Sequence, residues 1–122
     1  MAAARQGFTA TGVELNGWLV LYSKVAARLS RLENRATFRK QDLWTVDLRS
    51  YDNIILFGVD EMIPAFEQKI IKELSHKGNT ANLNNNPESS GIQVIACRFP
   101  LKILQPQCVI GEGIDTVWVY RF

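Results

Sequence analysis

The stretch that decides the fold runs from Asn53 to Val59 and reads Asn-Ile-Ile-Leu-Phe-Gly-Val. Four consecutive large apolar residues that end at a glycine are typical of a parallel strand covered on both faces. The residues that follow predict a helix from Asp60 to about Leu74, with acidic side chains in its first turn. Upstream, residues 8–15 predict a short buried strand, and apolar residues at helical spacing predict a helix over residues 17–32.

The remaining segments complete an alternating pattern. Phe38 marks a brief strand, and residues 93–97 predict a second buried strand. Residues 109–110 and 116–120 predict an antiparallel hairpin at the C-terminal end, and residues 79–90 predict a polar, Asn-rich loop. Strands that alternate with helices predict an α/β fold with a mostly parallel sheet and one domain over residues 1–122.

Length and composition exclude several classes of protein. The chain has 122 residues, of which 47% are hydrophobic and 21% charged, as in an ordinary globular domain. Its apolar stretches are far shorter than the roughly 18 residues of a membrane-spanning helix. Two cysteines, Cys97 and Cys108, are too few for a disulfide framework or for a zinc site of their own. We expect Cys97 to be a small apolar filler and the only histidine, His76, to lie at a surface helix end.

The net charge of +2 conceals a basic segment over residues 24–40, where Glu33 is the only acidic residue. In a helix, four basic residues of this segment fall on one face: Lys24, Arg28, Arg31 and Arg35. This face is either the solvated side of an amphipathic helix or a patch for acidic lipid, nucleic acid or an acidic partner. Nucleic acid is the weakest of these partners, because no aromatic residues are interleaved for base stacking.

Two acidic residues stand at predicted strand ends, where ligands bind in open α/β sheets. Glu14 closes the first strand, and a carboxylate there accepts hydrogen bonds from both hydroxyls of a ribose. It is equally consistent with a helix-start acid or a surface pair with Arg5 or Lys24. Asp42 follows the next strand, where an acid can accept from an adenine amino group or simply form a turn with its own backbone. Together the two acids suggest a cofactor that carries a nucleoside.

Other signals of a nucleotide site are weak. The sequence has no G-x-G-x-x-G fingerprint, and Gly111-x-Gly113 lies in the predicted hairpin turn. Nor does it have a cluster of metal-ligating residues. The large aromatic residues are expected to lie in the core, with two of them, Trp44 and Phe57, near the ligand edge: Trp18, Trp44, Phe57, Phe99 and Trp118.

Five motifs occur in one order along almost the whole chain: Gly12-Val13-Glu14-Leu15-Asn16, Asp42-Leu43-Trp44, Ile55-Leu56-Phe57-Gly58-Val59, Val94-Ile95-Ala96-Cys97-Arg98-Phe99-Pro100 and Gly111-Glu112-Gly113-Ile114-Asp115-Thr116-Val117-Trp118. This combination resembles the mitochondrial protein-lysine methyltransferases that modify the adenine nucleotide translocase and the ATP synthase c subunit. The last two motifs are specific, whereas the first two would suit many seven-strand methyltransferases.

The resemblance implies a Rossmann-like, seven-strand fold that uses S-adenosylmethionine to methylate a lysine of an inner mitochondrial membrane protein. It implies that Glu14 binds the cofactor ribose and that Asp42 and Leu43 contact the adenine. By the same resemblance, four residues would line the approach of the target lysine: Trp44, Phe57, Gly58 and Val59. It assigns no catalytic acid or base and no metal.

The chain departs from the family pattern at its front, where the membrane anchor, the first strand and the glycine-rich loop are missing. We therefore expect a truncated form that is inactive, or nearly so, on its own, because the methyl group would be badly placed. The alternatives are a non-catalytic fragment that binds a partner and, less well supported, a NAD-dependent oxidoreductase that uses Glu14 for its ribose.

Overall fold

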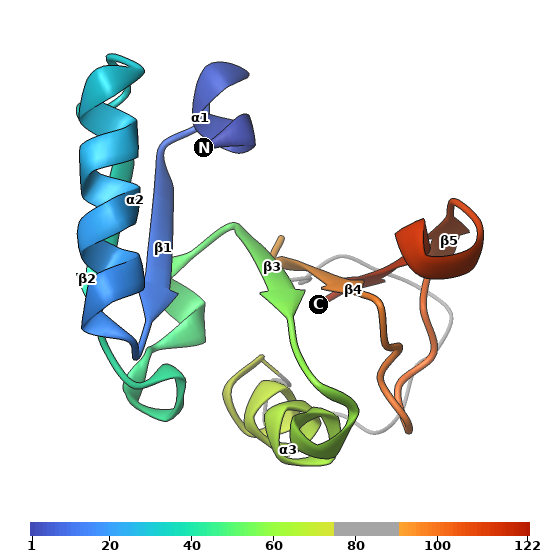
Figure 1. Cartoon of the computed structure of the whole chain (residues 1–122). Coiled ribbons are helices and arrows are strands. Elements are labelled where there is room, and N and C mark those ends of the chain that lie inside the picture. The colour runs from blue at the N-terminus through green and yellow to red at the C-terminus, as the bar shows by residue number, and fades with distance from the viewer. Residues whose placement is uncertain (75–90) are drawn as a thin grey trace. The chain divides into compact units, whose positions relative to one another are not determined.

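The computed structural model describes residues 1–74 and 91–122 (Figure 1). The chain divides into two compact units, Met1–Val46 and Asp47–Phe122, and each is described by itself. His76 and the Asn-rich loop predicted over residues 79–90 lie outside the described residues.

Unit 1 is a parallel strand pair connected by a helix. It contains α1 (Ala2–Arg5), β1 (Ala10–Glu14), α2 (Gly17–Leu29), β2 (Ala36–Lys40) and a single 3-10 turn, η1 (Leu43–Thr45). β1 pairs with β2 in parallel, in a register that runs from Ala10 opposite Ala36 to Glu14 opposite Lys40. The α2 N-cap is Asn16, whose side chain accepts a hydrogen bond from the Trp18 backbone N–H at 3.0 Å.

The core of unit 1 is small, and this corrects two predictions. It contains the buried alanines Ala4, Ala27 and Ala36, with Phe38 and a few other partly buried apolar residues packed against them. The first strand is therefore only partly covered along residues 10–13 rather than buried. Trp18, expected in the core, is 81% exposed because α2 turns its small residues toward the strands.

The predicted four-residue basic face on α2 is wrong. The helix ends at Leu29, and Arg31 has a φ of 56°, which is outside the helical region. Arg35 immediately precedes β2. Only Lys24 and Arg28 of the four lie on the helix, because the chain must reverse direction after Leu29 to start the parallel strand.

Unit 2 is a four-stranded mixed sheet with one long helix. It contains η2 (Leu48–Ser50), β3 (Asn53–Phe57), η3 (Asp60–Met62), α3 (Ile63–Leu74), β4 (Gln93–Cys97), β5 (Cys108–Ile110), η4 (Gly113–Asp115) and β6 (Val117–Arg121). The strand order is β3-β4-β6-β5. β3 and β4 are parallel, and β6 is antiparallel to both β4 and β5, so the predicted hairpin forms with β6 inserted next to β4.

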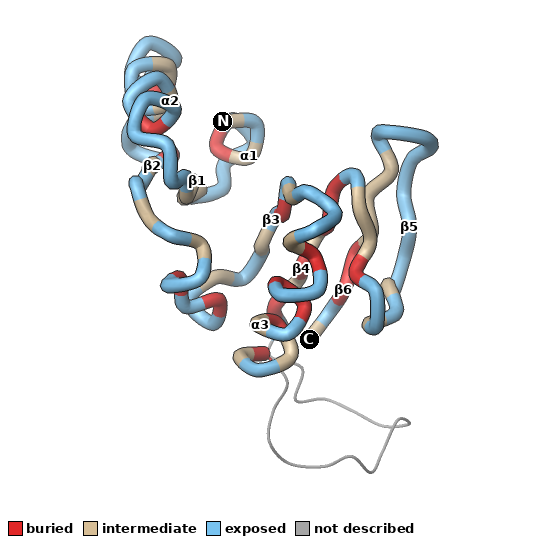
Figure 2. Tube along the Cα trace, turned by 60° about the horizontal axis from the view of Figure 1, so that its bottom comes forward, coloured by how far each residue is buried: buried red, intermediate tan, exposed pale blue. Residues whose placement is uncertain are grey.

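The core of unit 2 lies between the sheet and α3, as the red segments of Figure 2 show. Phe66 and Ile70 of α3 and Val94 and Ala96 of β4 are fully buried. The prediction that β3 is covered on both faces is wrong among the described residues. Leu56 is buried, but Phe57, which points to the opposite face, is 75% exposed.

Candidate functional site

The predicted ribose-binding residue, Glu14, ends β1 and is exposed. Its Oε1 accepts a hydrogen bond from the backbone N–H of Asn16 at 3.0 Å. This contact holds the carboxylate over the turn between β1 and α2. The described residues show no ion pair between Glu14 and Arg5 or Lys24, which were the alternative partners considered from the sequence.

The predicted adenine-binding residue, Asp42, lies directly after β2 and caps η1. Its Oδ1 accepts from the backbone N–H of Trp44 at 3.0 Å, while its carbonyl oxygen accepts from the Thr45 hydroxyl at 2.8 Å. The turn-forming role considered from the sequence is therefore present. The bond to Trp44 uses one of the two carboxylate oxygens.

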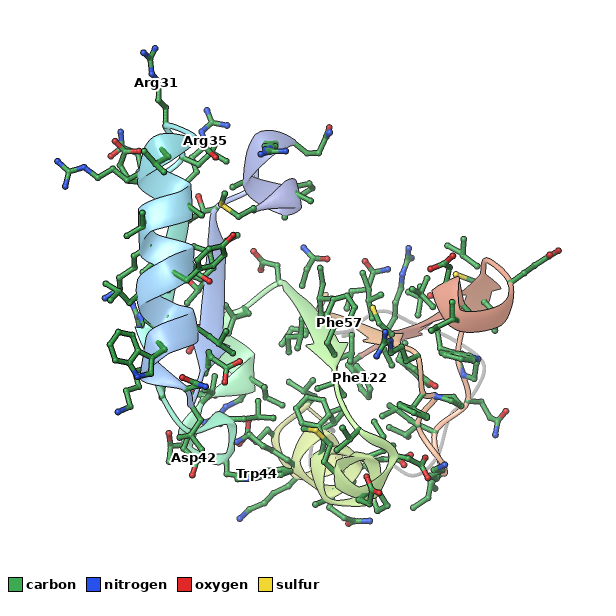
Figure 3. The ribbon with its side chains drawn as sticks, viewed as in Figure 1. Arg31, Arg35, Asp42, Trp44, Phe57 and Phe122 are labelled. Atoms are coloured by element: carbon green, nitrogen blue, oxygen red, sulfur yellow. The ribbon has the colours of Figure 1, made fainter. Side chains whose placement is uncertain are left out.

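The structure brings these two acids to the same edge of the strand pair. β1 and β2 are parallel, so their carboxyl ends point the same way, and the Gln41 backbone N–H donates to the Glu14 carbonyl at 3.1 Å. Figure 3 labels Asp42 and Trp44 at this edge, at the end of α2 opposite Arg31 and Arg35. Both carboxylates are thus fixed by the backbone of their own turns and face solvent.

Leu43 is half-buried and Trp44 is 45% exposed in the same turn, so apolar surface adjoins the two carboxylates. The other predicted substrate-lining residues, Phe57, Gly58 and Val59, belong to unit 2, at the carboxyl end of β3. Phe57 and Val59 are 75% and 59% exposed. The structure therefore gathers four of the seven predicted site residues on one edge of unit 1 and three in unit 2.

Sequence reasoning missed a second anchored carboxylate, that of Glu67 on α3. It is fully buried, and it accepts hydrogen bonds from three consecutive backbone N–H groups after β4, those of Lys102, Ile103 and Leu104, at 2.7 to 2.8 Å. A signal was available, because Glu67 interrupts the apolar stripe formed by Ile63, Phe66 and Ile70. A charged residue on a buried helix face needs a fixed set of donors.

The same loop after β4 has two further anchors. The Tyr120 hydroxyl accepts from the Leu101 backbone N–H at 2.9 Å, and Lys102 Nζ lies 2.7 Å from Asp60 Oδ1 in η3. Burial raises the pKa of Tyr120; the Leu101 hydrogen bond opposes this shift, and the nearby Glu67 charge adds to it. The loop is therefore fixed from α3, from β6 and from η3.

The described residues offer no other reactive cluster. They contain no group of three His, Cys, Asp or Glu side chains arranged to hold a metal ion. Cys97 is buried, as predicted, and Cys108 is exposed; both are free thiols, and burial raises the pKa of Cys97. Among the same residues no helix has the length and apolar content needed to cross a bilayer.

Comparison with known proteins identifies the family. Residues 1–108 match the family described as the ANTKMT methyltransferase domain. The chain belongs to this family. Its lysine N-methyltransferases for the ATP synthase c subunit, from Mus musculus and Homo sapiens, are each 42% identical over 120 residues, which is 98% of this chain but 43% and 46% of theirs. The adenine nucleotide translocase lysine N-methyltransferase of Mus musculus is 33% identical over 111 residues, or 91% of this chain and 42% of that protein.

The resemblance inferred from the five motifs is therefore confirmed. This ANTKMT-family chain spans less than half the length of these relatives. Among solved structures, an RNA methyltransferase from Salinibacter ruber in complex with S-adenosyl-L-homocysteine has a TM-score of 0.78 at 18% identity, over 98% of this chain and 69% of that one. That likeness confirms the Rossmann-like methyltransferase fold and concerns the fold alone.

Proposed function

We propose that this chain is part of a protein-lysine N-methyltransferase that uses S-adenosylmethionine and has a Rossmann-like, seven-strand fold. The relatives support the reaction, since those at 42% and 33% identity are named for lysine methylation of the ATP synthase c subunit and of the adenine nucleotide translocase. The target proposed here is accordingly a lysine of one of these two proteins. The location proposed is mitochondrial and associated with the inner membrane.

The observation that carries the proposal is the pair of backbone-anchored carboxylates at neighbouring parallel strand ends. Each holds one oxygen in its own turn, Glu14 with Asn16 and Asp42 with Trp44. We assign Glu14 to the two ribose hydroxyls and Asp42 to the adenine amino group, with half-buried Leu43 against the adenine ring. The chemistry of these donors and acceptors fits an adenosine, and the anchoring reduces the entropy lost on binding.

When bound, S-adenosylmethionine supplies an electrophilic methyl group. The chain's part is to hold the adenosine end and to present an apolar surface to the incoming lysine. We assign this surface to Trp44, Phe57, Gly58 and Val59, because a lysine amine must be neutral to accept a methyl group and burial against apolar residues favours the neutral form. No residue is assigned as a catalytic base.

Calorimetric titration of the 122-residue chain with S-adenosylhomocysteine tests the cofactor assignment. We expect saturable binding that weakens about tenfold or more in Glu14→Ala, since a charged hydrogen bond contributes about 1.5–3 kcal/mol. Glu112→Ala, which removes an exposed acid of unit 2, is the matched control and should bind normally. Equal affinity for wild type and Glu14→Ala would refute the ribose assignment, and tighter binding of NADH would favour an oxidoreductase.

A contact with anionic lipid is the second part of the proposal. It was first considered for Lys24, Arg28, Arg31 and Arg35, of which Lys24 and Arg28 lie on α2. The membrane proteins that the relatives are named for support such a contact, because an enzyme acting on them works next to a bilayer.

A further inference from the structure

The outward face of α2 is apolar. Four residues at helical spacing, Trp18, Tyr22, Val25 and Leu29, are 81%, 73%, 50% and 81% exposed. They lie opposite Val20 and Ala27, the two α2 residues that are buried. Leu21 widens this surface and is 52% exposed. We call these five residues the α2 stripe.

The α2 stripe has the composition of a helix that lies in a membrane interface. Indole and phenol rings, which have an apolar body and a polar tip, prefer the boundary between headgroups and acyl chains. A helix of 13 residues is about 20 Å long, too short to span a hydrocarbon core of about 30 Å. It could therefore lie only in the plane of the membrane.

Positive charge flanks the stripe on one side. Lys24 and Arg28 of α2 and Arg39 of β2 line a shallow groove of about 460 Å³ whose other walls include Ala27 and Phe38. None of the three cations forms an ion pair with a carboxylate among the described residues. Three unneutralised cations beside an exposed apolar surface are complementary to a surface that is anionic on top and apolar beneath.

We propose that α2 is an interfacial helix that docks this protein on an anionic lipid bilayer. The α2 stripe inserts at the boundary between headgroups and acyl chains, and the groove between α2 and β2 binds a lipid phosphate through Lys24, Arg28 and Arg39. This inference deepens the lipid contact of the proposed function. It does not depend on the cofactor assignment, which concerns the carboxyl edge of the same strand pair.

Co-sedimentation of the full chain with vesicles tests the inference. We expect binding to vesicles of phosphatidylcholine and phosphatidylglycerol that exceeds binding to phosphatidylcholine alone by about tenfold or more, and that falls as salt is added. Trp18→Ser/Leu29→Ser should lower binding to the mixed vesicles at least tenfold. Val109→Ser/Ile114→Ser is the matched control, because these unit 2 residues are also exposed, at 53% and 69%.

The charge of the groove is tested separately. Lys24→Glu/Arg28→Glu should abolish the preference for phosphatidylglycerol, whereas Lys72→Glu/Arg121→Glu, an equal change at exposed sites of unit 2, should leave it intact. If inorganic phosphate displaces the protein from the vesicles at millimolar concentration, the groove binds free phosphate and the lipid assignment is wrong.

Two other results would overturn the inference. Equal binding to both kinds of vesicle would exclude anionic lipid, and self-association lost in Trp18→Ser/Leu29→Ser without vesicle binding would assign the α2 stripe to a protein contact. S-adenosylhomocysteine affinity, measured on the same variants, should stay unchanged. A loss of vesicle binding with normal cofactor binding therefore concerns this inference alone, and the reverse concerns the proposed catalysis.

Discussion

Glu67 binds the loop after β4 through a carboxylate that is removed from water and surrounded by backbone donors. Its two oxygens accept from the N–H groups of Lys102, Ile103 and Leu104. Burial of a carboxylate costs free energy, and these three charge-assisted bonds offset that cost. The arrangement fixes the loop to α3 without any apolar contact being required at those three residues.

We expect Glu67→Gln to lower the free energy of unfolding by about 2–4 kcal/mol, because the amide loses an accepting oxygen and points an NH2 group at backbone donors. Chemical denaturation followed by circular dichroism would measure the change. Glu61→Gln, at an exposed acid of η3, should change stability by less than about 0.5 kcal/mol. Equal stability of the two variants would show that the three hydrogen bonds contribute little.

Tyr120 predicts a loss of stability in alkali. Burial raises its pKa above the ordinary value of 10.0, so the folded chain holds the proton more tightly than the unfolded chain. The stabilisation is complete below the ordinary pKa and is lost as the pH rises through the folded pKa. Cys97, whose pKa is raised from 9.0 by burial, acts in the same direction. Stability should therefore fall as the pH is raised above about 9.

Thermal unfolding as a function of pH would measure this dependence. Tyr120→Phe should flatten the alkaline decline while lowering stability at neutral pH, since Leu101 loses its hydrogen-bond acceptor. Tyr22→Phe removes a hydroxyl that is exposed on α2 and should keep the wild-type profile. An alkaline decline that is unchanged in Tyr120→Phe would assign it to other groups.

At the scale of elements, the strand pair of unit 1 depends on a close approach between Gly12 and Phe38, which face each other in the register. A Cβ atom at Gly12 would lie 2.6 Å from Cδ1 of Phe38, whose ring packs against the alanine core. We expect Gly12→Ala to destabilise the chain by about 1–3 kcal/mol. Gly17→Ala, where the nearest atom is Lys40 Cδ at 3.6 Å, should have little effect.

A double-mutant cycle isolates the Gly12–Phe38 contact. Gly12→Ala/Phe38→Leu should cost less than the sum of the two single changes, because the smaller side chain leaves room for the added methyl group. Additive changes in denaturant midpoint would mean that the strand pair tolerates the methyl group by another movement.

Periodicity predicted the elements better than their orientation. The apolar spacing over residues 17–32 correctly predicted α2, but a helix with apolar residues around most of its circumference has two candidate inner faces. The three-alanine core selects the face with Val20 and Ala27, because small side chains let the helix approach the strands closely. Phe57 shows the same limit in β3, since an uninterrupted apolar run does not say which face is covered.

At the scale of the whole molecule, the candidate cofactor edge was predictable and the loop anchor was not. Glu14 and Asp42 were found because acids at the ends of successive parallel strands must meet at one edge, a consequence of topology alone. The partners of Glu67 lie 35 to 37 residues away along the chain and donate through their backbone. Backbone donors have no signature in side-chain sequence, so only the unexplained charge on the apolar stripe could have drawn attention to Glu67.

The two units have different cores, and this predicts different local stability. Buried residues of unit 1 are mostly alanine and valine, whereas unit 2 buries large side chains such as Phe66, Ile70 and Tyr120. Because less apolar area is removed from water, we expect amides of α2, β1 and β2 to exchange faster than those of α3, β4 and β6.

Hydrogen exchange followed by mass spectrometry would measure this difference, with and without S-adenosylhomocysteine. A ligand that binds only the folded form stabilises the segment that holds it, so the proposed adenosine contacts should slow exchange in unit 1 most strongly around residues 10–17 and 40–46. Glu14→Ala should lose this protection, while Glu112→Ala should keep it. Protection that instead appeared uniformly in both units would show that the ligand acts through global stability, and the assignment of its adenosine end to unit 1 would then be wrong.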